Sequence, residues 1–141
     1  MRVWLARGAR LAITRAAALA HPHEACGLLL GDRAAEGWRV RWASVGANVA
    51  AEPHRRFELD PGHLFAAWRA ARAGGPAILG VWHSHPSGAP TLSEADRAGV
   101  TDPGWLWLVV TPEDMAVFLP DPEQASGFRP LLLLPEDAGS V

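Results

Sequence analysis

The sequence predicts one α/β domain with a mixed sheet, and three observations support this. Strand and helix patterns alternate along the first part of the chain, and strand patterns dominate the last part. The length of 141 residues suits a single hydrophobic core. We therefore expect one domain over residues 1–135 and a disordered polar tail over residues 136–141.

Helices are expected in three places. Residues 10–20 are rich in helix-forming residues, and His21-Pro22 ends this pattern because the residue before a proline avoids the helical conformation. Asp60-Pro61 combines an N-cap residue with a proline at the first helical position, and Gly74-Gly75 stops the helix that follows. A third, shorter helix is expected over residues 93–100, after a loop rich in proline and glycine.

The expected strands are short apolar or alternating segments. Residues 25–31 form an apolar run, and Gly31-Asp32 is a turn signal at its end. Residues 38–49 alternate in part, with Val40 and Trp42 on one side of the strand. The remaining expected strands are residues 77–82, a hairpin formed by residues 105–111 and 115–119, and residues 128–134.

Composition and charge exclude several classes of function. The net charge is -2 and the arginines are dispersed, so no basic face for nucleic acid is expected. No apolar run approaches the ~18 residues of a membrane span, and we expect no signal peptide. Cys26 is the single cysteine, which excludes an internal disulfide and fits a cytoplasmic protein. The absence of Lys and Tyr excludes lysine and phenol chemistry.

The segment from His83 to Asp96 carries most of the chemical information. His83 and His85 are residues i and i+2 at the end of an expected strand, so their imidazoles can face one point. Asp96 adds a carboxylate from the start of an expected helix. Imidazole nitrogens and carboxylate oxygens bind zinc, and three protein ligands leave the fourth tetrahedral position open, as in catalytic sites. We predict one zinc ion per chain on these three residues.

A general base is expected elsewhere in the chain. Glu24 is a lone carboxylate at the mouth of an apolar strand, where partial desolvation raises its pKa. Ser93 can donate its hydroxyl to an oxyanion, and it also has the position of a helix N-cap. Simpler interpretations stand beside these: a lone His-x-His pair is often structural, and Cys26 is typical of a core residue. A nucleophilic pair of Cys26 with a histidine is the alternative chemistry.

This set of residues resembles the JAMM/MPN+ (Mov34/MPN/PAD-1) zinc metallopeptidase family. The motif consists of His83, His85, Pro86, Ser93 and Asp96, with Glu24 upstream. The segment from Glu24 through Cys26-Gly27 resembles the compact bacterial branch, whose members cleave C-terminal extensions from small ubiquitin-like sulfur-carrier proteins. The resemblance implies zinc ligation by His83, His85 and Asp96, with Glu24 as base and Ser93 as oxyanion stabiliser. It also implies a three-layer fold, similar to cytidine deaminases, with a curved mixed sheet between helices.

The expected function is therefore zinc-dependent hydrolysis of a peptide or isopeptide bond by zinc-activated water, with Glu24 as general base. The expected substrate is the C-terminal tail of a small ubiquitin-like or sulfur-carrier protein. The short chain favours a single carrier domain over a ubiquitin chain. Two alternatives remain: a catalytically silent scaffold of the same fold, and a zinc amidase that acts on small molecules.

Overall fold

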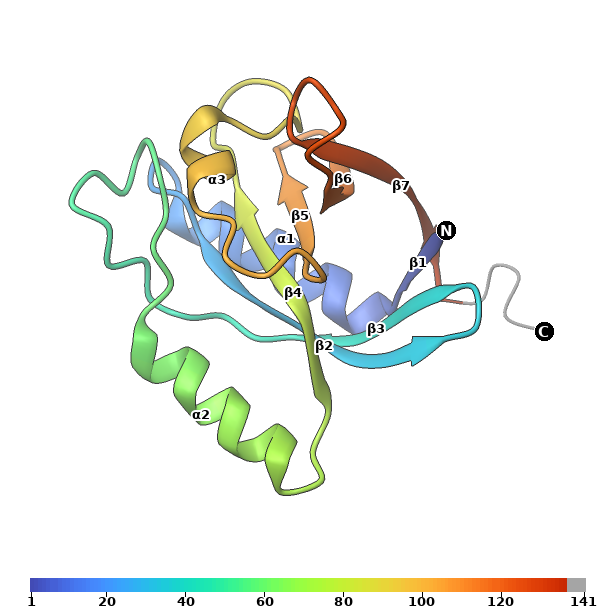
Figure 1. Cartoon of the computed structure of the whole chain (residues 1–141). Helices are drawn as coiled ribbons and strands as arrows, with labels where there is room; N and C mark the ends of the chain where they lie inside the picture. The colour runs from blue at the N-terminus through green and yellow to red at the C-terminus, as the bar shows by residue number, and fades with distance from the viewer. Residues whose placement is uncertain (137–141) are drawn as a thin grey trace.

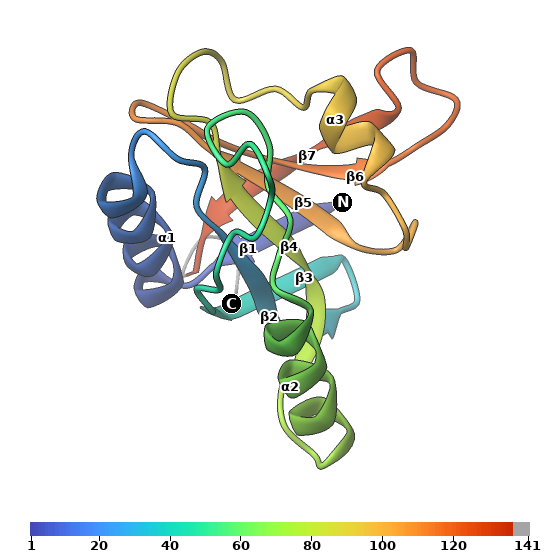
Figure 2. The ribbon, with the colours of Figure 1, turned by 90° about the vertical axis from the view of Figure 1, so that its left-hand side faces the viewer.

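Seven strands form one strongly curved sheet in a computed structural model that describes residues 1–136. Their order is β1-β3-β2-β4-β5-β6-β7, and parallel pairing of β1 with β7 closes the sheet into a barrel. The helices flank this sheet (Figures 1 and 2). The strands are β1 (Arg2–Leu5), β2 (Cys26–Ala34), β3 (Gly37–Ala43), β4 (Ala77–Ser84), β5 (Leu106–Val110), β6 (Met115–Pro120) and β7 (Phe128–Pro135). The predicted mixed α/β domain is confirmed.

Helix α1 (Arg7–Ala20) covers the main core and packs against β3, β4 and β5. Its buried residues Ala9 and Ile13 contribute to one apolar cluster with side chains from most strands of the sheet. The helix begins at Arg7 rather than at residue 10, and the four residues Arg2–Leu5 before it form a strand that the sequence pattern did not suggest. This strand pairs with both β3 and β7, so its structure depends on partners far away in the sequence.

The turn expected at Gly31-Asp32 is wrong, because β2 continues to Ala34. Gly31 lies where the β2–β3 register shifts, so close to the Arg39 carbonyl that a Cβ would collide with it. At this shift Arg41 of β3 has no opposite residue on β2. This extra residue in β3 reverses which of its side chains face the core on the two sides of the bulge. Val40 is therefore buried, whereas Trp42 is 54% exposed instead of sharing its side.

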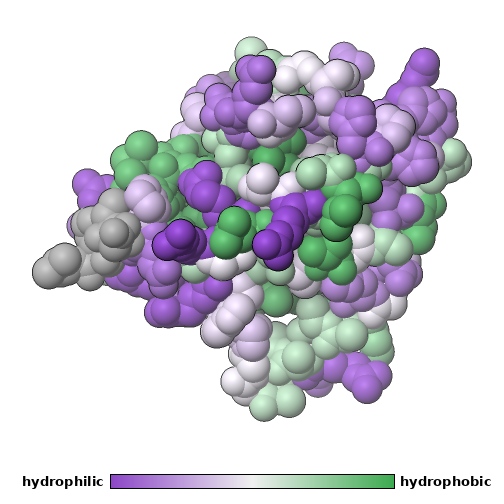
Figure 3. Space-filling view, turned by 180° about the vertical axis from the view of Figure 1, so that it is seen from behind, coloured by the Kyte–Doolittle hydropathy of each residue, from purple (hydrophilic) through white to green (hydrophobic). Residues whose placement is uncertain are grey.

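The other two helices precede and follow β4 in the sequence. Helix α2 (Pro61–Arg72) begins as predicted, with the Asp60 side chain accepting a hydrogen bond from the Gly62 amide. It buries none of its residues and projects from the domain in Figures 1 and 3. Helix α3 (Glu94–Ala98) is short and begins after Ser93. The predicted hairpin of residues 105–119 is confirmed as β5 and β6.

No helix within residues 1–136 is long and apolar enough to cross a membrane. Seen from behind, the surface interleaves hydrophilic and hydrophobic side chains (Figure 3). The disordered tail expected over residues 136–141 lies outside the described residues from residue 137 onward.

Candidate active site

The three predicted zinc ligands meet at the end of β4. His83 is the penultimate residue of β4, and His85 follows the strand directly. Their Nε2 atoms lie 3.1 Å apart. Asp96 folds back from α3 and contacts both rings, with Oδ1 3.1 Å from His83 Nε2 and Oδ2 3.3 Å from His85 Nε2. His83 and Asp96 are buried and His85 is half-buried, so the cluster lies mostly below the protein surface.

These separations match the requirements of a tetrahedral ion. Ligand atoms about 2.0–2.1 Å from a tetrahedral zinc lie about 3.3 Å from one another. The contacts among His83, His85 and Asp96 are 3.1–3.3 Å. Two neutral nitrogens and one carboxylate are also a ligand set that zinc accepts. The three side chains are therefore close enough together to contact one ion.

Glu24 lies beside this cluster, on the neighbouring strand end. One of its carboxylate oxygens and one nitrogen from each of His83 and His85 all lie within 4.8 Å of one another. Its side chain is buried, and Oε1 has no hydrogen-bond partner among residues 1–136. Ser84 holds the adjacent backbone: its amide donates to the Ala25 carbonyl at 3.0 Å, and its Oγ accepts from the Ala25 amide at 2.8 Å. A buried, unpaired carboxylate is thus placed where a metal-activated group would act.

Burial and charge tune the ionisable groups of the site. Desolvation raises the pKa of Glu24 to about 7, helped by the negative charge of Asp96 and opposed by His85. Burial lowers the pKa of His83 despite its contact with Asp96, which keeps this imidazole neutral. Burial opposes ionisation of Asp96 too, but the two histidines hold its pKa well below its usual range. At neutral pH the cluster offers a neutral imidazole and an ionised carboxylate.

The pKa of His85 responds to competing influences. Burial lowers it, but hydrogen bonding to Asp96 and the charges of Asp96 and Glu24 together raise it above its ordinary value. A metal ion in the cluster would displace the proton that Asp96 favours on this ring.

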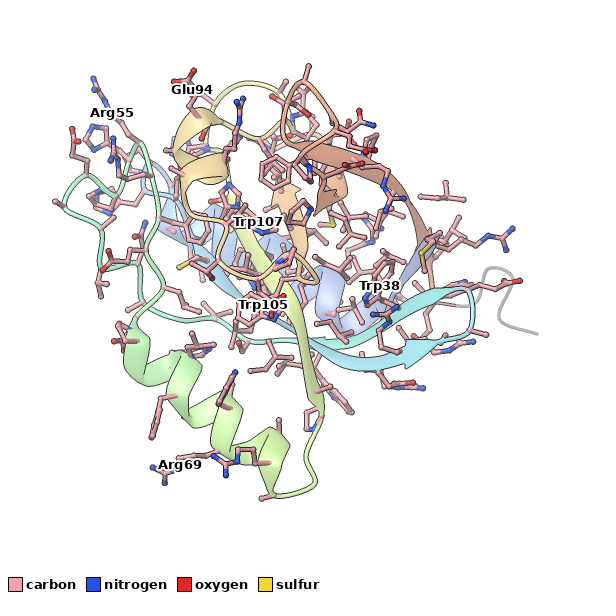
Figure 4. The ribbon with its side chains drawn as sticks, viewed as in Figure 1. Trp38, Arg55, Arg69, Glu94, Trp105 and Trp107 are labelled. Atoms are coloured by element: carbon pink, nitrogen blue, oxygen red, sulfur yellow. The ribbon has the colours of Figure 1, made fainter. Side chains whose placement is uncertain are left out.

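Ser93 fixes Asp96 through a capping box. The Ser93 amide donates to Asp96 Oδ2 at 2.8 Å, and the Asp96 amide donates to Ser93 Oγ at 3.1 Å. The N-cap interpretation of Ser93 is therefore confirmed. Its hydroxyl proton takes no part in these bonds and is free for another acceptor. Glu94, the next residue, points outward from α3 (Figure 4).

Cys26 does not have the surroundings of a nucleophile. It is fully buried, and its Sγ donates to the Ala47 carbonyl at 3.7 Å. Burial, followed by the charge of Glu24, raises its pKa to about 12, which disfavours the reactive thiolate. The structure therefore favours Cys26 as a core residue over the Cys–His alternative.

Aromatic side chains that the sequence did not mark as functional surround His83. The Phe57 ring stacks on the His83 ring at 4.4 Å between centroids and 19° between planes. Trp107 of β5 meets His83 edge-on at 6.0 Å, and it lies near the centre of Figure 4. Phe57 comes from the loop of residues 44–60; the strand expected over residues 38–49 ends at Ala43, so its last six residues belong to this loop. The neighbours of Phe57 in the sequence, Arg56 and Glu58, are charged, and no motif marks it as functional.

Two pockets border the cluster. One, of about 280 Å³, lies beside Asp96 and is walled mainly by apolar side chains such as Phe57, Val81 and Trp105. The other, of about 310 Å³, lies beside His85 between α1 and the start of the β5–β6 turn. The cluster therefore has one recess lined by Asp96 and a second recess lined by His85.

Comparison with known families identifies related sequences. The family model described as prokaryotic homologs of the JAB domain matches residues 6–121, which include all five predicted site residues. A desampylase of Haloferax volcanii is 38% identical over 92 residues, which make up 65% of this chain and 65% of that protein. The match therefore spans slightly less than two thirds of the relative's length.

Solved structures show the same architecture. A protein from Salinibacter ruber aligns with a TM-score of 0.72 and 29% identity, covering 96% of this chain and 93% of its own. Protein DSY2949 from Desulfitobacterium hafniense aligns with a TM-score of 0.81 and 26% identity, over 96% and 92% of the two chains. A JAB1/MPN domain protein from Archaeoglobus fulgidus shares the fold with a TM-score of 0.59 at 21% identity, over 93% and 98%.

Proposed function

This chain belongs to the family of prokaryotic homologs of the JAB domain, and on that premise we propose that it is a zinc-dependent isopeptidase or peptidase. The observation that carries the proposal is the contact triangle of His83, His85 and Asp96 with the buried, unpaired carboxylate of Glu24 beside it. His83, His85 and Asp96 would hold the metal. When bound, zinc supplies Lewis acidity, which lowers the pKa of the attacking water and polarises the scissile carbonyl.

Glu24 acts as the general base and then as the general acid. A pKa of about 7 suits both halves of this task, because the carboxylate can take a proton from water and return it to the leaving amine near neutral pH. The absence of a hydrogen-bond partner for Oε1 among the described residues supports this role, since the oxygen remains free for water. Asp96, whose pKa is held low, stays ionised as a metal ligand throughout.

Ser93 contributes to the site in two ways. Its backbone amide and Oγ fix Asp96 through the capping box, which orients the carboxylate toward both histidines. Its free hydroxyl proton donates to the oxyanion that develops on the scissile carbonyl. Neither bond of the capping box has to break for this donation, because Oγ accepts one hydrogen bond and donates another.

The proposed substrate is a small ubiquitin-like protein joined through its C-terminal tail. The Haloferax relative is a desampylase, which implies a hydrolase that acts on an isopeptide bond of a small archaeal ubiquitin-like protein. We propose that an extended tail crosses the cluster and uses the pocket beside Asp96 and the pocket beside His85. Two separate recesses beside the cluster suit a polypeptide better than a small amide.

Metal analysis tests the proposal directly. The wild-type chain, purified without added zinc, is compared with His83→Ala and Asp96→Ala and with the surface controls His54→Ala and Asp32→Asn. We expect near-stoichiometric zinc in the wild type and both controls, and little in the site variants. Fusions of ubiquitin-like carriers to a peptide, or to a lysine side chain, then report cleavage. Zinc retained by both site variants, or no cleavage of any fusion by zinc-loaded protein, would refute the proposal.

A further inference from the structure

His83 lacks the hydrogen bond that usually orients a metal-binding histidine. Such a ligand commonly donates its second ring nitrogen to a carboxylate, a carbonyl or water, which fixes the ring. His83 is completely buried, and its Nδ1 has no partner among residues 1–136. Its orientation must therefore come from packing.

Phe57 supplies that packing. Its ring is stacked nearly parallel to the His83 imidazole, with centroids 4.4 Å apart. Trp107 closes the arrangement by meeting both rings edge-on, Phe57 at 5.8 Å and His83 at 6.0 Å. A buried ring that packs against two aromatic side chains has little freedom to rotate away from its partners.

Asn48 holds the loop that carries Phe57. Its Nδ2 donates to the carbonyl of Arg56 at 3.1 Å, and its Oδ1 accepts from the amide of Glu58 at 3.0 Å. These two residues flank Phe57, so one amide side chain holds the backbone on both sides of the stacking ring. Figure 2 shows the loop after β3 crossing in front of β2 and β4. Phe57 of this loop reaches the end of β4, where it stacks on His83.

The same side chain also holds the base. Asn48 Nδ2 donates to the carbonyl of Glu24 at 2.9 Å, and the Glu24 amide donates to the Pro53 carbonyl of the same loop at 2.7 Å. Both backbone polar groups of Glu24 are thus bonded to this one loop. Asn48 therefore holds both the backbone of the proposed base, Glu24, and the loop whose Phe57 ring packs on His83.

We propose that Asn48 and Phe57 are positioning residues that fix His83 and Glu24 relative to each other. Phe57 replaces the missing hydrogen bond of His83 by stacking, and Asn48 sets the position of Phe57 and of the Glu24 backbone. The inference rests on the proposed function for its metal, but it concerns residues outside the ligand set, and its test reads zinc affinity rather than cleavage. The zinc affinity of the chain should therefore depend on side chains outside the ligand set.

Competition with a chromogenic zinc chelator tests this. We expect Phe57→Leu and Asn48→Ala each to weaken zinc binding by about tenfold, the lower end of what outer partners of metal ligands contribute. Phe57→Tyr keeps the aromatic face and should bind like the wild type. Phe65→Leu is the matched control, because Phe65 lies on α2 and is 62% exposed. Urea unfolding of the metal-free variants shows whether each remains folded under the assay conditions.

The double variant separates positioning from general loosening of the loop. If Asn48 acts through Phe57, Asn48→Ala combined with Phe57→Leu should weaken zinc binding no more than Asn48→Ala alone. Fully additive losses, or wild-type affinity in a folded Phe57→Leu protein, would overturn the inference while leaving zinc binding by the wild type intact. A wild-type chain that binds no zinc would instead refute the proposed function, and the inference with it.

Discussion

Cys26 and His83 face each other across the antiparallel pairing of β2 with β4. Cys26 is the first residue of β2, and His83 is the penultimate residue of β4. Glu24 therefore lies just before β2 and His85 just after β4, so both residues lie at the same end of this strand pair. The proposed base and two of the proposed metal ligands thus take their relative positions from a backbone register rather than from mobile loops.

Replacing Glu24 by Gln should abolish most activity without loss of metal. The amide cannot accept the water proton, so we expect kcat to fall by about 10²–10⁴-fold. Zinc content should stay at the wild-type level because Asp96, not Glu24, contacts both histidines at hydrogen-bond distance. Cleavage rates and metal analysis of the same preparation check the predicted loss of kcat and the predicted retention of zinc. Loss of zinc in this variant would make Glu24 a ligand and contradict its role as base.

Glu94→Gln is the matched control for that experiment. It makes the same chemical change on α3, close to the site in sequence, but its side chain is exposed and points outward (Figure 4). We expect wild-type activity from this control, which would show that a loss in Glu24→Gln reflects the position and not the change of net charge.

The contribution of Glu24 to the stability of the metal-free protein should fall as the pH rises from 5 to 8. Its pKa is 4.5 in the unfolded chain and about 7 in the folded one. The folded state therefore holds this proton more tightly, so the stabilisation is complete below pH 4.5 and is lost as the pH rises through 7. At 1.36 kcal/mol per pKa unit, the loss over this range is about 2–3 kcal/mol.

Comparison with Glu24→Gln follows this contribution, because His83 and His85 are present in both proteins and Asp96 stays ionised in both. The Gln variant cannot ionise, so its free energy of unfolding in EDTA should exceed that of the wild type increasingly from pH 5 to pH 8. Urea titrations at several pH values measure the difference. If the free energy of unfolding changed with pH in the same way in both proteins, burial would not raise the pKa of Glu24.

The proposed ligand set could be predicted from the sequence because its geometry is largely local. An i, i+2 histidine pair on a strand points to one side whatever the rest of the fold, and Ser93-x-x-Asp96 is a local helix start. The importance of Asn48 and Phe57 could not be predicted in this way. Asn48 falls within the strand expected over residues 38–49, which ends instead at Ala43, and Phe57 follows in the same loop. The conformation of this loop depends on hydrogen bonds to Glu24, which belongs to a distant segment of the chain.

The errors in the predicted fold have a similar origin. The strand Arg2–Leu5 is stabilised by β3 and by β7 at the other end of the chain, so no local pattern predicts it or the closure of the barrel. Gly31-Asp32 is a dipeptide typical of turns. In the structure Gly31 lies inside a bulged strand, where the Arg39 carbonyl comes so close that only glycine fits. Glycine indicates either a turn or a close backbone approach, and only the tertiary contacts distinguish them.

Gly27→Ala should destabilise the strand end that precedes the site. A Cβ at Gly27 would collide with the Ser44 carbonyl and with Trp82 Nε1, which are the acceptor and donor of a 2.8 Å hydrogen bond. Forcing them apart overpacks the core and leaves a buried donor unpaired, so we expect a loss of about 2–4 kcal/mol in the free energy of unfolding. Gly8→Ala in α1, where a Cβ meets nothing within 4 Å, should be neutral or slightly stabilising.

Substitutions of Ser93 can separate its capping role from its proposed donation to the oxyanion. Ser93→Ala removes both the cap and the hydroxyl, whereas glycine is a tolerable N-cap that costs only a few tenths of a kcal/mol. We expect Ser93→Ala to lose about 1 kcal/mol of stability and Ser93→Gly much less. If the hydroxyl stabilises the oxyanion, both variants should lose kcat by about 10²-fold with little change in KM. Near-wild-type kcat in a stable, zinc-loaded Ser93→Gly protein would limit Ser93 to holding Asp96.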